Sequence, residues 1–89
     1  MKTAKERKFE MDEVNQRIKI VDKILDRAQD KGAYKVSLDY EYNEVFKNLN
    51  VTCGFLHKHI DRVFSELGYR VSDRSTGPRT FGIEISWEN

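Results

Sequence analysis

The stretch GYRVSDRSTGPRTFGIEISW, residues 68–87, decides the fold of this chain. In its second half, every other residue is apolar, at Phe81, Ile83, Ile85 and Trp87. This period of two is typical of a strand with one buried face. Tyr69 and Val71 begin a similar run, and the turn-forming residues 73–78 separate the two runs. The stretch therefore predicts a C-terminal β-hairpin.

The residues before the hairpin predict a strand and then a helical region in two parts. The strand has its apolar residues at alternate positions, Tyr34, Val36, Leu38 and Tyr40. The apolar residues after it have helical spacing, namely Val45, Phe46 and Leu49, followed by Leu56, Ile60, Val63 and Leu67. Asn50 and Gly54 interrupt this region, and Thr52 is a good cap for its second part. The region is either one kinked helix or a helix-turn-helix.

The N-terminal third of the chain predicts one long amphipathic helix that ends at Asp30-Lys31-Gly32. Its apolar row has spacings of three and four, at Met11, Val14, Ile18, Val21, Leu25 and Ala28. Ile20 and Ile24 widen the apolar surface on one flank. We expect a homodimer in which Met11, Val14, Ile18, Val21 and Leu25 form the interface. The alternative is that the domain's own core takes up both flanks.

Together these elements predict an α+β fold in two layers, with helices on one face of a small sheet. The order is helix, strand, helix or helix pair, strand, strand. The chain is expected to be a single domain, residues 1–89, with the long helix at 1–31 and an α/β body at 34–87. Most aromatic residues fall at inward positions, which predicts core packing for them. A winged-helix-like arrangement is compatible with this order.

The composition and net charge of the chain favour a binding protein over an enzyme. With 16 basic and 15 acidic residues the net charge is +1, so no global field steers the chain onto nucleic acid. Cys53, His57, His59 and Asp61 lie close in sequence but match no zinc spacing, and no second nucleophile partner is evident. We therefore expect no enzyme activity, no metal and no cofactor. No run of apolar residues is long enough for a membrane span, which favours a cytoplasmic protein without a membrane partner.

Several short motifs resemble the small accessory proteins of tailed bacteriophages. They are the opening MKTAKER, the step Gly32-Ala33-Tyr34-Lys35-Val36, the step Leu67-Gly68-Tyr69-Arg70-Val71 and the ending Ile85-Ser86-Trp87. The resemblance implies host take-over or counter-defence, in which the protein binds and inhibits or redirects a component of the host cytoplasm. The partner would be a host protein, a nucleic acid or a nucleotide ligand.

Residues 34–87 also resemble winged helix-turn-helix domains. In that resemblance 42–49 is the first helix of the motif, 50–52 the turn, 54–67 the recognition helix and 73–80 the wing. It implies a DNA-binding transcriptional regulator, which is the alternative function.

The best candidate for a binding site is the hairpin. Arginine forks and hydroxyls suit phosphate or carboxylate partners, and the hairpin carries Arg70, Arg74, Ser75, Thr76 and Arg79. Lys58 and Arg62 on the second helical part are further candidates. The alternative is a solvated loop whose arginines pair with Asp73 or Glu84.

Overall fold

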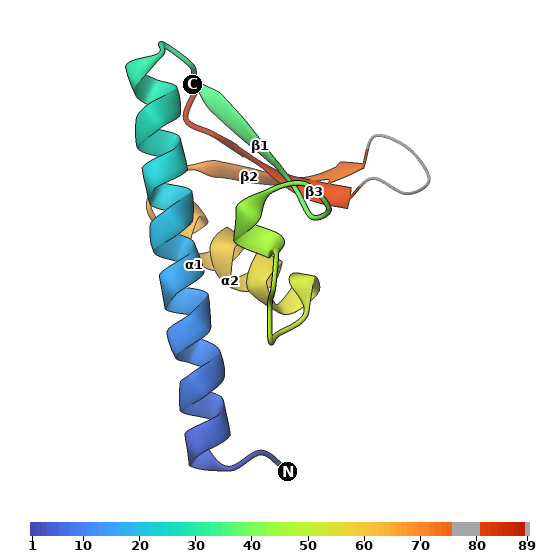
Figure 1. The fold of residues 1–89 in the computed structure, drawn as a ribbon. Coiled ribbons are helices and arrows are strands. Elements are labelled where there is room, and N and C mark those ends of the chain that lie inside the picture. Colours follow the sequence, from blue (N-terminus) through green and yellow to red (C-terminus); the bar gives the residue numbers. More distant parts are fainter. Residues whose placement is uncertain (76–80, 89) are drawn as a thin grey trace.

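The computed structural model describes residues 1–75 and 81–88. Helix α1, Ala4–Asp30, is the longest element and runs along the long dimension of the molecule (Figure 1). Twenty-seven residues at 1.5 Å each make a helix of about 40 Å, close to the longest extent of the molecule, 43 Å. The Thr3 hydroxyl caps its start by accepting the Glu6 backbone N–H at 3.1 Å. Gly32 follows its end with a φ of +84°, as the sequence predicts. Neither α1 nor any other helix in the described ranges is both long and apolar enough to cross a membrane.

The sheet confirms the predicted strands and hairpin. Strands β1 (Lys35–Asp39), β2 (Arg70–Ser75) and β3 (Phe81–Ser86) are antiparallel in the order β1-β3-β2. Ile85 of β3 lies opposite Val36 on one side and Val71 on the other, which makes one face apolar. The residues one step away, Ser37, Ser72 and Glu84, make the other face polar. Figure 1 shows the sheet beside the C-terminal half of α1, with the hairpin pointing away from that helix.

The middle helical region is shorter than the sequence predicts. A helix over 42–49 is wrong, because only a 3₁₀ turn, η1 (Glu44–Phe46), forms there. The Asn43 side chain accepts the Val45 N–H at 3.0 Å, and Asn48 takes a left-handed φ of 57°, so the turn does not extend into a helix. Helix α2 (Cys53–Glu66) then starts where predicted, with the Thr52 hydroxyl accepting the Phe55 N–H at 3.1 Å.

The core lies between the apolar face of the sheet and the two helices. Helix α1 contributes Val14 and Val21, both 0% exposed, and Leu25, 4% exposed, to this core. The predicted interface is therefore wrong for these three residues, because a second copy could not reach them without opening the core. Met11 and Ile18 are partly buried against the same core. Dimerisation stays a prediction, and it would need a surface other than this row.

Two aromatic residues depart from the expected core packing. Tyr34 is 62% exposed and Phe81 is 56% exposed. Tyr34 precedes β1, and Phe81 is the first residue of β3, so each lies at an end of the sheet. Phe46 and Phe64 are buried, as predicted.

Candidate functional site

Helix α2 has one buried face and one open face. Leu56, Ile60 and Phe64 are at most 2% exposed and point into the core. Lys58 and Arg62 are exposed and lie one turn apart, which places them side by side on the open face. The first turn of α2 contains no acidic residue. Because the start of a helix carries a partial positive charge, the first turn of α2 adds to the positive charge of Lys58 and Arg62 further along the helix.

His59 adds a third basic group beside Lys58 and Arg62. One nitrogen of the Arg62 guanidinium lies 3.4 Å from His59 Nδ1, and the Phe55 ring packs edge-on against the imidazole with 4.7 Å between centroids. Burial lowers the pKa of His59, and the positive charges of Arg62 and Lys58 lower it further. We call Lys58, His59 and Arg62 the α2 basic face.

The hairpin residues that the structure describes are spread along β2. Arg70 is exposed at the start of β2, opposite Ser86, whereas Arg74 pairs with Gly82 and Ser75 with Phe81. Arg74 is four residues further along β2 than Arg70, a distance of about 13 Å along the strand. Arg70 therefore lies at the end of the sheet away from the turn. Thr76 and Arg79 lie outside the described residues.

A hydrogen-bonded chain of three side chains links the turn after β1 to α2 and β2. The Tyr40 hydroxyl bonds Nδ1 of His57, and Nε2 of His57 lies 2.8 Å from an Asp73 carboxylate oxygen. The Tyr40 ring also packs on Phe46, with 4.6 Å between centroids. Burial, together with the thiol of Cys53 and the carboxylate of Asp73, raises the pKa of Tyr40. His57 therefore fixes the strand that leads into the hairpin relative to α2.

Two side chains of α1 hold the loop that leads into α2. The Glu13 carboxylate accepts the Asn50 backbone N–H at 2.8 Å and the Asn50 side-chain amide at 2.7 Å. The Arg17 guanidinium donates to the carbonyl oxygens of Glu44 at 3.0 Å and Asn48 at 3.4 Å. The loop residues that Glu13 and Arg17 bind all precede Thr52, so these hydrogen bonds fix the start of α2 relative to α1.

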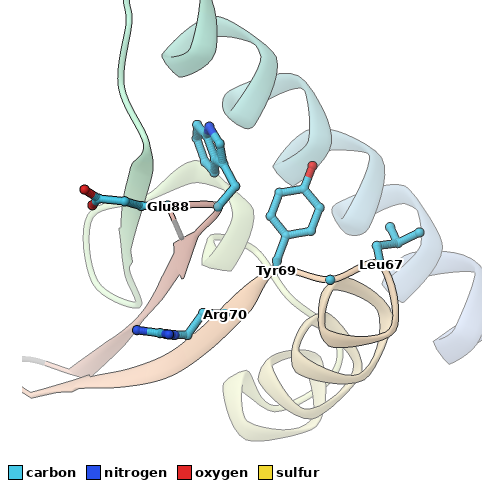
Figure 2. A pocket seen from close by; sticks show the side chains of 6 residues that line it. Leu67, Tyr69, Arg70 and Glu88 are labelled. Atoms are coloured by element: carbon cyan, nitrogen blue, oxygen red, sulfur yellow. The ribbon is translucent and has the colours of Figure 1, made fainter.

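A cavity of about 260 Å³ lies at the opposite end of α2 from its first turn. Figure 2 shows Tyr69 pointing toward α1 on one side of it, with Arg70 and Glu88 extending away. Trp87 packs edge-on against Tyr69, with 6.1 Å between centroids. Of the predicted site residues that the structure describes, only Arg70 lines this cavity, and it lies apart from the α2 basic face.

Within residues 1–75 and 81–88, no three histidine, cysteine, aspartate or glutamate side chains are placed to share a metal ion. Comparison of the chain with protein-family models, with curated proteins and with solved structures finds no match. What the protein does must therefore be argued from its own surface.

Proposed function

We propose that this protein is a non-catalytic binding protein whose partner is nucleic acid, contacted through the α2 basic face. The observation that carries the proposal is the α2 basic face, where Lys58 and Arg62 are exposed beside His59, on a helix with no acidic residue in its first turn. A nucleic-acid partner is compatible with the accessory role that the resemblance to phage proteins implies. We take DNA as the target. Such a protein would act in the cytoplasm of the host cell.

The surroundings of α2 support this mode of binding. Helix α2 follows a capped turn and the β2-β3 hairpin comes directly after it, as the recognition helix and the wing do in a winged helix-turn-helix domain. The 3₁₀ turn η1 stands where the first helix of that motif would be. In helix-turn-helix proteins the second helix enters the major groove with its N-terminal residues on the bases. Glu13 and Arg17 hold the turn before α2, and His57 holds the strand after it. These contacts thus hold the residues before and after α2, and none of them involves Lys58 or Arg62 of the α2 basic face.

The net charge of +1 bears on how strongly the affinity for nucleic acid should depend on salt. Because no large field surrounds the molecule, affinity depends on a few local contacts with phosphates. Each phosphate neutralised by a lysine or arginine contributes about 0.9 to the slope of log K against log salt. Lys58 and Arg62 together therefore account for a slope of roughly 2.

The test compares two charge reversals on equivalent helical positions. Lys58→Glu with Arg62→Glu removes the α2 basic face, and Lys19→Glu with Lys23→Glu makes the same charge change at the same spacing on α1, where both lysines are exposed. Binding of a short duplex DNA is followed by fluorescence anisotropy at several salt concentrations. We expect the α2 pair to weaken binding by more than about tenfold and the α1 pair by less than about threefold. Equal losses in the two variants, or no binding by the unmodified chain, would contradict the proposal.

A host protein is the second candidate partner, and one observation favours it. Phe9 is 57% exposed on α1 and borders a hollow of about 390 Å³, together with Lys5, Glu6, Glu10 and Asn50. Affinity capture from a bacterial lysate, with and without nuclease, separates the two classes of partner. A partner that survives nuclease and is lost with Phe9→Glu would favour protein binding at this hollow, whereas material lost on nuclease treatment would favour DNA.

A further inference from the structure

The contact between Arg62 and His59 defines the protonation state of the histidine. A guanidinium can only donate hydrogen bonds, so the imidazole nitrogen that faces it, Nδ1, must act as the acceptor. Nδ1 faces the Arg62 nitrogen at 3.4 Å. This geometry fits a neutral ring with its proton on Nε2. A proton on Nδ1 would point an N–H group at the guanidinium and place two positive charges side by side.

The positive charges nearest to His59 favour this neutral form. On α2 its neighbours are Lys58, Arg62 and the edge of the Phe55 ring. On the other side of Phe55, the Lys2 ammonium lies 5.9 Å from the ring centroid and is paired with Glu10 of α1 at 2.7 Å. Asp61 accepts the Ser65 hydroxyl at 2.8 Å. The Glu10 carboxylate is thus paired with Lys2, and the Asp61 carboxylate with the Ser65 hydroxyl.

We propose that phosphate binding at the α2 basic face is coupled to the uptake of one proton by His59, so that the protein binds nucleic acid more tightly in mild acid. This inference rests on the proposed function and adds a regulation of the same site. A phosphate oxygen takes over the hydrogen bond that Arg62 donates to Nδ1. A proton from solvent then binds the freed Nδ1, and the resulting imidazolium donates to the phosphate as a third positive group.

The sign of the effect follows from linkage. In the free protein the pKa of His59 lies below its ordinary value, and a bound anion raises it because it stabilises the charged ring. Affinity therefore increases as the pH falls between the bound and the free pKa. A difference of about one pH unit between them corresponds to an affinity gain of about tenfold. The protonated ring also steepens the salt dependence by up to about 0.9 in slope.

The first experiment measures the affinity for a short duplex DNA between about pH 8 and about pH 5.5, the range in which a histidine changes charge. The unmodified chain should bind about tenfold more tightly at the acid end. His59→Gln should lose the increase, whatever its affinity at the alkaline end. His57→Gln is the matched control, because His57 lies in the Tyr40 and Asp73 network, and it should keep the increase. A pH dependence that survives in His59→Gln, or binding that does not change with pH, would overturn the coupling and leave the proposed function standing.

A second experiment keeps the inference testable without DNA. The pKa of His59 is followed by NMR with and without inorganic phosphate as the probe. A rise of the His59 pKa with phosphate, absent in Arg62→Gln, would support the coupling even if duplex DNA did not bind. An unchanged His59 pKa at saturating phosphate would overturn it.

Discussion

Replacing Glu13 with alanine should loosen the loop that leads into α2. The carboxylate accepts two hydrogen bonds from Asn50, at 2.8 and 2.7 Å. A hydrogen bond to a charged group contributes about 1.5–3 kcal/mol when buried. These bonds are exposed to solvent, which can replace them, so we expect a combined loss of about 1.5 kcal/mol. For 89 residues the unfolding entropy is about 190 cal/mol/K, and this loss corresponds to a fall in Tm of about 8 °C.

The pH dependence of this loss identifies its cause. Partial burial raises the pKa of Glu13, but hydrogen bonds from Asn50 and Val51 and the charge of Arg17 outweigh it and lower the pKa below its ordinary value. A carboxyl group with a lowered pKa stabilises the fold above its unfolded pKa, and this contribution disappears as the pH falls through the folded pKa. The difference between Glu13→Ala and the unmodified chain should therefore shrink below about pH 4.

Urea unfolding followed by circular dichroism measures both effects, with Asp12→Ala as the control. Asp12 is the exposed neighbour of Glu13 on α1, so its replacement makes the same charge change without touching Asn50. The reasoning is refuted if the two variants have equal free energies of unfolding at neutral pH, or if the Glu13→Ala deficit is unchanged in acid.

Two further changes test the sheet and the histidine network. Gly82→Ala should lower the free energy of unfolding by about 2 kcal/mol or more, because the new Cβ would collide with the Leu38 carbonyl oxygen of β1. Gly54→Ala is the control and should not lower it, because the space around the new Cβ is open. Equal stabilities of the two variants by urea unfolding would argue against the close approach at Gly82. His57→Ala should cost about 1–2 kcal/mol, because the part-buried Tyr40 hydroxyl loses its partner. Asp73→Asn should cost under about 0.5 kcal/mol, because the Asp73 side chain is 90% exposed. A larger loss in Asp73→Asn than in His57→Ala would show that the ion pair, rather than the hydroxyl, dominates.

Local patterns were sufficient to predict most elements of the fold. The alternation from Phe81 to Trp87 and from Tyr34 to Tyr40 identified β3 and β1, because a strand's side chains alternate whatever covers them. Thr52 marked the start of α2 because its hydroxyl can reach the N–H group three residues on, which is a local interaction. The same patterns failed at 42–49, where asparagine side chains compete for backbone hydrogen bonds and the apolar spacing alone does not reveal this.

The candidate site was only partly predictable. Lys58 and Arg62 could be placed on one face of α2 because their spacing of four residues is a property of the helix. His59 shares a spacing of three with Arg62, and that signal could have linked the two. Tyr40, His57 and Asp73 offered no such signal, because they come from three different elements and meet only after folding.

The sequence by itself determined that α1 has one apolar side, that α2 starts at a capped turn, and that the chain ends in a hairpin. Each of these depends on residues within a few positions of one another. Only the tertiary structure decided what the apolar side of α1 faces, because a row of Val14, Val21 and Leu25 is equally suited to a second helix or to the chain's own core. Folding also brought Glu13 to Asn50 and His57 to Asp73. Such contacts depend on how the elements pack, and the spacing of residues within one element carries no information about that.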